Sequence, residues 1–526
     1  MRSPLIPIGL ALISALLRFL AFTQTPFANG WDSYFYLVQI KSLEETGHMH
    51  SPEASLIYPY LRLFYWLVGD YVLALKIGTA VLCGVFMLVL CRRSQSLPLL
   101  GAWSLFSPQL TYFAAQYPKN LLGLVLFVAF VRSLDWTFTK PRAWLAIPAF
   151  LLIINCFGHR MMFGLAVVHL FLWLGFRFKE RLPRRAWCFH QAHVKQDAQS
   201  KHPLRRLHLV KTPSAAAKAW KILLVSGIAI GALLLAGQSF PGLAHITDLG
   251  RLSGTFDWQP QFAPWSFVQS FGLERISGWW IFEISMVMVW WIGGLILWKN
   301  RNGIANPALF WLCGLLLFPF LEWSLTGLAW RMFLVFVLLV PLAFDFQNVS
   351  KKASIAFFMA LVAASFFSWK SYSPRLHDPD YALFKKVTGK VQSQLPDPDS
   401  FGTKLSGSSI QNKPELFIAH NALAEYFTFT TGTDAMPWLP EYAVDSSKLW
   451  RIAAGVQGQT LRYFAGPENE LKIKNLGGGY FLLPEFVWQN ALKNALAEGD
   501  EYFLETAESW LNPYRIRPAF LLKRKQ

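Results

Sequence analysis

The chain has 526 residues, of which 54% are apolar, and it holds 23 tryptophans and 45 phenylalanines, far from the usage of a soluble globular protein. This composition argues against an ordinary soluble enzyme and predicts a polytopic membrane protein. The net charge of +18 raises the question of nucleic acid. Most of the basic excess lies in loops predicted to face the cytoplasm, so no nucleic-acid partner is expected.

Apolar runs of roughly 16 to 21 residues, against about 20 needed to cross the hydrocarbon, predict about eleven transmembrane helices. They lie near residues 4–23, 71–91, 97–115, 119–134, 143–158, 161–176, 220–238, 279–298, 306–325, 329–346 and 353–370. The first run is expected to be a retained helix, because no small-residue cleavage site follows it. The predicted fold class is mainly α: a polytopic helical membrane domain over 1–370, followed by a C-terminal exterior α/β domain over 371–526.

The basic loop 177–221 fixes the predicted orientation. It carries twelve Lys and Arg residues against only Glu180 and Asp197, and such an excess stays in the cytoplasm. The N-terminus is then cytoplasmic. The first loop 24–70, the later loop 239–278 and the C-terminal domain lie outside, and we expect a bacterial inner membrane.

The first exterior loop opens with "NGWDSYFYL", in which Asp32 precedes a run rich in aromatic residues. Residues 34–40 suit an amphipathic helix at the membrane surface. The stretch 58–68, which begins "YPYL", is a second such segment and is too short to span. Asp32 therefore stands at a helix start, where it is either a catalytic acid or a simple N-cap that accepts backbone N–H bonds.

Cations are predicted where spans meet the outer face: Lys119 in "QYPKN", Arg160 in "FGHRMMF", Arg331 in "LAWRMF" and Arg18 near the end of the first helix. A charge at membrane depth is costly and marks a functional candidate, and guanidinium groups match phosphate bidentately. The alternative is snorkelling toward the headgroups. His159, beside Arg160, is a further candidate, although it is more often a satisfied polar residue than a ligand or base.

Imidazoles and a carboxylate gather later in the first loop, at His48, His50 and Glu53. Such groups suit a divalent ion, although their spacing matches no zinc signature.

In the C-terminal region, "ELFIAH" and "GGGYFLLPE" have the length and aliphatic character of strands. "FVWQNALKNALAEGDEYFLETAESWL" shows a helical repeat interrupted at Gly499. These segments predict the small α/β domain.

The first part of the chain holds, in order, a first span, an exterior loop opening "GWDSYFYL", the "YPYL" stretch, "GDYVLALKIGTAVL" and the basic turn "CRRS". This order of segments resembles that of the GT-C glycosyltransferases. That superfamily includes protein O-mannosyltransferases, aminoarabinose transferases of lipid A and oligosaccharyltransferase catalytic subunits. The segment "LFSPQLTYFAAQYPKNLLGLVLFVAFV" resembles the matching pair of spans. The likeness covers about residues 1–180, and the later spans only by their layout.

The resemblance implies transfer of a sugar from a polyprenyl-phosphate donor to a glycan, lipid or protein acceptor at the outer face. Asp32 stands where the superfamily keeps its first-loop catalytic acid, beside a divalent cation such as Mg²⁺ or Mn²⁺ if one is used. The second acid that the superfamily often has in the next exterior turn is replaced here by Lys119. Lys119 would then bind the phosphate, or His48, His50 or Glu53 would complete a metal site.

Two alternatives stay open. One is a transporter or flippase of a lipid-linked solute, for which inverted repeats and broken midplane helices are typical. The other is a catalytically silent relative that acts as a binding module.

Overall fold

The computed structural model describes residues 5–51, 53–91, 107–138, 146–179, 306–316 and 328–343. In the C-terminal region it describes 417–419, 421–432, 435–437, 480–484, 502–506 and 519–524, and it adds a few short or isolated positions between 105 and 389. The predicted spans 220–238, 279–298 and 353–370 lie outside the described residues apart from such isolated positions, as do nearly all of the basic loop and the whole of the loop 239–278.

Two described helices are long and apolar enough to cross a membrane, α1 (Leu5–Phe22) and α4 (Tyr71–Cys91). A third candidate is a bent pair, α6 (Pro108–Gln116) and α7 (Pro118–Phe138), whose axes differ by 119°. The break falls at Tyr117, because the residue before a proline is disfavoured in the helical region. The bend turns the junction of α6 and α7 into a corner.

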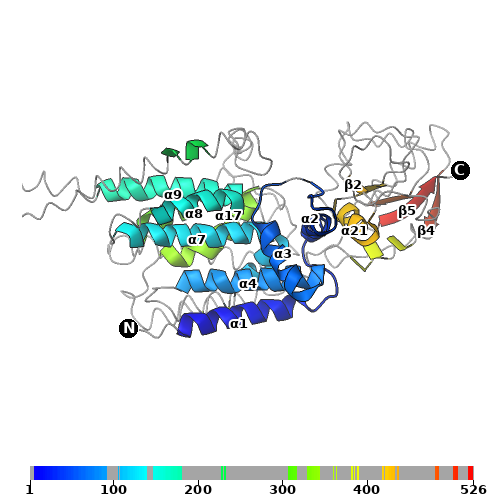
Figure 1. Ribbon diagram of the computed structural model, residues 1–526, viewed down its shortest axis with the longest axis horizontal. Coiled ribbons are helices and arrows are strands. Elements are labelled where there is room, and N and C mark those ends of the chain that lie inside the picture. Colours follow the sequence, from blue (N-terminus) through cyan, green and yellow to red (C-terminus); the bar gives the residue numbers. More distant parts are fainter. Residues whose placement is uncertain are drawn as a thin grey trace, which may run out of the picture.

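Shorter helices complete the described membrane domain: α8 (Ala146–Gly158), α9 (Arg160–Lys179), α16 (Pro307–Leu316) and α17 (Leu328–Ala343). Helices α1, α4, α7, α8 and α9 lie side by side along the long axis (Figure 1). Helix α7 packs closely on α8 and α9, since a Cβ atom on Gly123 would stand 2.7 Å from the Cβ atom of His159. That contact places His159 against α7.

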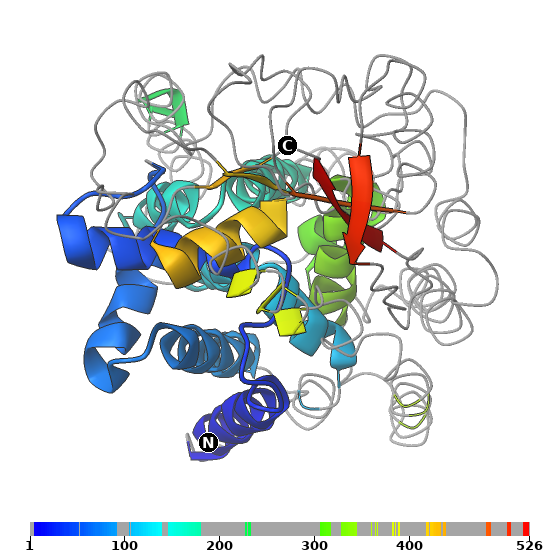
Figure 2. The same cartoon turned by 90° about the vertical axis from the view of Figure 1, so that its right-hand side faces the viewer.

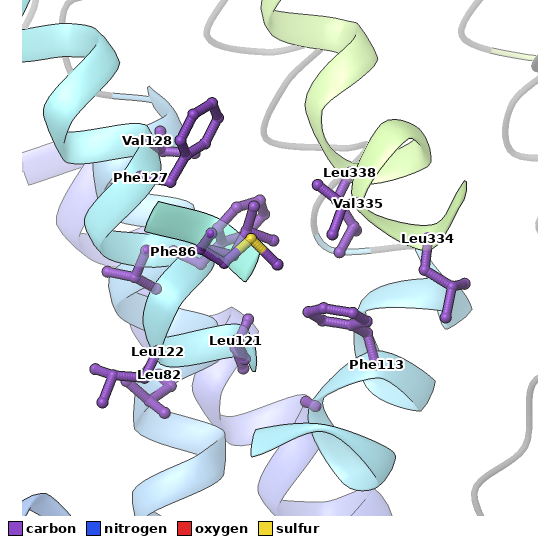
Figure 3. Close-up of a cluster of buried hydrophobic side chains, with 14 of the residues drawn as sticks. Leu82, Phe86, Phe113, Leu121, Leu122, Phe127, Val128, Leu334, Val335 and Leu338 are labelled. Atoms are coloured by element: carbon purple, nitrogen blue, oxygen red, sulfur yellow. The ribbon is translucent and has the colours of Figure 1, made fainter. Parts of the chain in front are cut away.

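The core between these helices is made of large aliphatic and aromatic side chains from helices distant in sequence. Figure 3 shows part of it, with side chains from α4, α6, α7 and α17 facing one another: Leu82, Phe86, Phe113, Leu121, Leu122, Phe127, Val128, Leu334, Val335 and Leu338. The labelled residues are at most 9% exposed. This packing holds the start of α17 near the corner between α6 and α7.

Helix α2 (Ser33–Thr46) differs from its prediction as a surface helix. Residues on nearly all of its sides are buried, among them Tyr34, Leu37, Gln39 and Ser42. The physical reason is that helix α21 (Asn421–Thr431) of the C-terminal region lies over it (Figure 2). Hence α2 is enclosed by protein rather than laid on lipid.

Helix α3 (Ile57–Val68) does have the predicted amphipathic form. It buries Ile57, Tyr58 and Leu61, while Trp66 and Leu67 are 60% and 72% exposed. An exposed row of apolar and indole side chains of this kind suits the membrane interface.

The described C-terminal region contains α21 and five strands. The strands β1 (Phe417–Ala419) and β2 (Ala435–Pro437) flank α21 and pair in parallel. Strands β3 (Tyr480–Pro484), β5 (Ala519–Arg524) and β4 (Tyr502–Thr506) form an antiparallel sheet in that order. β1 and β3 fall on predicted strands. The helical repeat predicted over residues 486–511 is wrong over β4, because residues 502–506 form a strand that pairs with β5.

Candidate functional site

The candidate site begins at the N-terminus of α2, where Asp32 occupies the N-cap position. The Asp32 side chain makes no capping hydrogen bond and is exposed. The turn before α2 is held by other groups: Ser33 Oγ donates to the carbonyl oxygen of Asn29, and the Trp31 N–H donates to Gln116 Oε1 at 3.2 Å. The interpretation of Asp32 as a simple N-cap is therefore wrong for its side chain.

Gly30 sets the position of this turn against the corner of α6. Its φ is +99°, and a Cβ atom there would lie 2.1 Å from the carbonyl oxygen of Ala115. Only glycine allows the backbone to approach so closely at such a φ. The hydroxyl of Tyr381 donates to the Gly30 carbonyl oxygen at 2.5 Å, so the turn is also held from the C-terminal side.

Arg331, near the start of α17, faces the same corner. Its guanidinium carbon lies 4.6 Å from the centre of the Tyr117 ring, and the two side chains are hydrogen bonded. Arg331 attracts Asp32 electrostatically. The structure thus brings together two of the predicted site residues from segments about 300 residues apart in sequence.

The protein around Asp32 changes its acidity. The Asp32 side chain stays accessible to solvent, yet the protein around it desolvates the carboxyl enough to raise its pKa, and the positive charge of Arg331 opposes this rise without cancelling it. The pKa of the Tyr36 hydroxyl is also raised well above its ordinary value, first by burial and then by the charges of Asp32 and Glu53. Asp32 is therefore a stronger base than an ordinary surface aspartate.

A second pair of charges lies between the first loop and α7. Lys119 Nζ forms an ion pair with Glu53 Oε1, and the Tyr58 hydroxyl donates to the other oxygen of Glu53. Burial raises the pKa of Glu53, but the charge and hydrogen bond of Lys119 prevail and hold it below its ordinary value. Lys119 is thus partnered by Glu53, and it also lies within electrostatic range of Arg160.

His159 lies in the break between α8 and α9, among three cations. Burial lowers the pKa of its imidazole well below the ordinary value, and the charges of Lys119, Arg331 and Arg160 lower it further. Its Nδ1 atom accepts a hydrogen bond from the Met161 N–H at 3.2 Å. We call Lys119, Arg160 and Arg331 the cation cluster, with neutral His159 among its members.

The two remaining candidates of the first loop lie elsewhere. His48 and His50 are exposed and follow Gly47, which ends α2. Asp32 stands at the other end of this 14-residue helix, which at 1.5 Å per residue is roughly 20 Å long. Among the described residues no three metal-ligating side chains gather, so the expected completion of a metal site by His48 or His50 does not fit.

Comparison with known proteins gives structural likeness only. No protein family model matches the chain, and no curated protein sequence does. The chain is similar to ArnT from Cupriavidus metallidurans bound to undecaprenyl phosphate, with a TM-score of 0.48 and 11% identity over 98% of this chain and 97% of that one. The structure of ArnT in the apo state has a TM-score of 0.48 and 10% sequence identity.

A third similar structure is the archaeal oligosaccharyltransferase AglB from Archaeoglobus fulgidus, in complex with an inhibitory peptide and a dolichol-phosphate. Its TM-score is 0.48 and its identity 11%, over 91% of this chain and 69% of that one. ArnT and AglB are both GT-C glycosyltransferases. These likenesses concern the path of the chain and assign no side chain a role.

One residue of the site was not singled out from the sequence. Glu425 of α21 interacts electrostatically with Asp32 and, more weakly, with the backbone of Phe35 in the first turn of α2. It also acts on the hydroxyls of Tyr36 and Tyr58. Burial, and then the charge of Asp32, raise the pKa of Glu425 well above its ordinary value. No spacing in the sequence links it to the first loop.

Proposed function

We propose that the protein is an integral membrane glycosyltransferase that moves a sugar from a polyprenyl-phosphate donor to an acceptor at the outer face. The observation that carries this proposal is that Asp32, whose side chain makes no capping hydrogen bond, lies within electrostatic range of Arg331. The resemblance of the first 180 residues to GT-C glycosyltransferases supplies the reaction class. The N-terminus would be cytoplasmic and the site would face the periplasm of a bacterial inner membrane.

The chemistry follows from the two sides of the site. Asp32 takes the proton from the acceptor hydroxyl, and the freed oxygen forms a bond to the anomeric carbon of the sugar. The bond from that carbon to the phosphate oxygen breaks, and the electron pair leaves with the polyprenyl phosphate. Arg331, with Arg160 and Lys119 nearby, stabilises the charge that develops on the phosphate.

Neutral His159 is accounted for in this scheme without a proton transfer. Because its pKa is lowered well below the ordinary value, it adds no positive charge to the cation cluster. Its Nδ1 already accepts a hydrogen bond from the backbone. We assign His159 the role of an uncharged side chain that separates the three cations of the cation cluster.

The expected Mg²⁺ or Mn²⁺ has no set of three ligating side chains among the described residues, and no step above uses a metal. The transporter alternative predicts charged groups near the midplane of the bundle. Helix α2, and with it Asp32, lies at one end of the helices (Figure 1), which favours the transferase.

The test is Asp32→Asn in proteoliposomes, measured as release of undecaprenyl phosphate from an undecaprenyl-phosphate-linked hexose. Loss of a general base typically costs about 10² to 10⁴ in rate, and we expect a loss in that range with the protein folded and inserted. Arg331→Lys should also impair the reaction, since the charge stays but the bidentate geometry is lost.

Asp70 provides the matched control, because it is a true capping aspartate. Its Oδ1 accepts the Leu73 N–H at 2.6 Å in the first turn of α4. Asp70→Asn should therefore leave the rate within about threefold of the parent, and Asp70→Ala should lower stability by about 1 kcal/mol. Asp32→Asn with a rate close to that of Asp70→Asn would refute the catalytic role.

A further inference from the structure

Helix α3 packs along the first part of α4, which is long and apolar enough to span a membrane. The Tyr60 hydroxyl donates to the carbonyl oxygen of Gly78 at 2.7 Å, and a Cβ atom on Gly78 would stand 2.8 Å from the Cδ2 atom of Leu61. Gly78 lies about two helical turns, or roughly 10 Å, beyond Tyr71, where α4 begins. Amphipathic helices at a membrane surface lie about 5–10 Å into the boundary between headgroups and acyl chains. The contact therefore places α3 at that boundary.

The outward side of α3 is apolar and exposed. Leu63, Trp66 and Leu67 are 51%, 60% and 72% exposed, whereas Ile57 and Leu61 on the inward side are fully buried. At the end of α3 the rings of Tyr65 and Tyr71 stack at 4.0 Å. Since that stack fixes the turn between α3 and α4, the exposed leucines are held toward the lipid.

A polar rim, which we define as Glu44, Arg62 and Trp66, borders this apolar surface. Arg62 Nε forms an ion pair with Glu44 Oε1, and Trp66 Nε1 donates to the same oxygen at 3.1 Å. The guanidinium carbon of Arg62 lies 4.9 Å from the centre of the Trp66 ring. The side chains of Arg62 and Glu44 are 32% and 18% exposed, so the pair is open to a ligand.

Two groups of the polar rim are left for that ligand. Among the residues that the structure describes, the terminal nitrogens of Arg62 and the Oε2 atom of Glu44 form no further hydrogen bond. The terminal nitrogens are donors in a planar fork that matches phosphate, and a carboxylate oxygen accepts from an ammonium group. An indole at this depth is typical of the membrane interface. The rim thus offers one site for an anion and one for a cation, above a surface for acyl chains.

The charges of the rim select among phospholipids. Arg62 and Glu44 cancel each other, so the rim favours a zwitterionic headgroup over one with a net negative charge. A primary ammonium can donate hydrogen bonds to Glu44, and the quaternary ammonium of choline cannot. Choline is instead attracted by aromatic faces, and Arg62 already lies over the Trp66 ring.

We propose that the polar rim binds phosphatidylethanolamine. The phosphate accepts hydrogen bonds from the terminal nitrogens of Arg62, the ammonium donates to Glu44 Oε2, and the acyl chains lie along Leu63 and Leu67. Because Glu44 is in the last turn of α2, the lipid ties α2 as well as α3 to the membrane surface. This site is independent of the transfer reaction proposed above and is formed by other residues than the cation cluster.

The experiment is native mass spectrometry of the delipidated full chain in detergent. Dioctanoyl phosphatidylethanolamine, phosphatidylcholine and phosphatidylglycerol are added one at a time, and the quantity measured is the dissociation constant of the first bound lipid. Hydrogen bonds between charged groups are the stronger ones, and we expect phosphatidylethanolamine to bind roughly fivefold or more tightly than either of the others. Equal affinities, or tighter binding of phosphatidylcholine or phosphatidylglycerol, would overturn the proposal.

Variants test the two halves of the rim. In Glu44→Gln the preference for phosphatidylethanolamine over phosphatidylcholine should largely disappear, and Arg62→Met should weaken the binding of all three lipids. Glu45→Gln is the matched control, since Glu45 is the neighbouring exposed acid and its replacement removes the same charge outside the rim. It should keep the parent preference, and a preference that is unchanged in Glu44→Gln would also overturn the proposal.

A last measurement separates a lipid from a soluble ligand. Glycerophosphoethanolamine has the same headgroup without acyl chains, and it should compete with the lipid only weakly because Leu63 and Leu67 contribute nothing to its binding. Competition as strong as that of the lipid itself would show a site for a soluble phosphoryl compound and would refute the assignment. The measurements on the parent chain decide the proposal even if a variant does not fold.

Discussion

Replacing Gly30 by alanine should displace the catalytic turn, and the structure indicates by how much. The new Cβ atom would lie 2.1 Å from the carbonyl oxygen of Ala115 and 3.2 Å from the Cα atom of Gln116. Both are backbone atoms of α6 and cannot rotate away. To restore even a tight contact of 3.0 Å, the turn and α6 must separate by about 1 Å, a shift that can cost roughly 10² in rate.

Two costs add in this variant. A residue other than glycine at positive φ costs about 1 kcal/mol or more, and overpacking costs typically 1–3 kcal/mol. We expect Gly30→Ala to lose about 2–4 kcal/mol of stability. The displaced turn also carries the Trp31 N–H away from Gln116 and the Gly30 carbonyl oxygen away from Tyr381.

Gly47 allows the two costs to be separated. It also has a positive φ, +75°, but nothing lies within 4 Å of a Cβ atom built on it. Gly47→Ala should therefore show only the backbone cost, about 1 kcal/mol, and keep its activity. The assay is denaturant unfolding in detergent followed by tryptophan fluorescence, together with the donor-release rate. Equal stability and equal activity of the two variants would refute the reasoning about the close contact.

Two further predictions concern charge and orientation. Because Lys119 holds the pKa of Glu53 below its ordinary value of 4.5, the ionised Glu53 stabilises the fold above that pH, and this contribution is lost as the pH falls through the lowered pKa. The stability difference between the parent and Glu53→Gln should thus be present at pH 7 and shrink below about pH 4.5; a difference that grows on acidification would contradict the assignment. The basic loop predicts that a reporter fused after residue 375 is exterior and that one inserted near Gln196 is cytoplasmic; finding both on one side would overturn the orientation.

The sequence predicted those features that depend on neighbouring residues. The limits of α4 follow from one long, mainly apolar run, and the break between α6 and α7 falls where a proline interrupts the pattern. Asp32 was expected at a helix start for similar local reasons. Whether its carboxylate caps that helix depends on the conformation of the side chain in the folded protein, which the neighbouring residues do not determine.

The parts that could not be predicted depend on long-range packing. The aromatic side chains of α2 suggested a helix on lipid, because a pattern cannot distinguish lipid from a covering helix such as α21. The ion pair of Lys119 with Glu53, an acid 66 residues earlier, was not predicted either, because no spacing in the sequence joins the two. Glu425 lies about 400 residues after Asp32, so no local pattern in the sequence links this acid to the first loop.

The contact between Lys41 and Phe429 joins residues 388 positions apart. A ribosome adds about 5 to 20 residues per second, so roughly 20 to 80 s separate the synthesis of these two residues. During that interval the buried side chains of α2 are not yet covered by α21, although the first membrane helices are already being inserted. The cover over α2 is therefore completed only after α21 has been synthesised, and a chain stopped before α21 would have Asp32 on a helix whose buried side chains are left open.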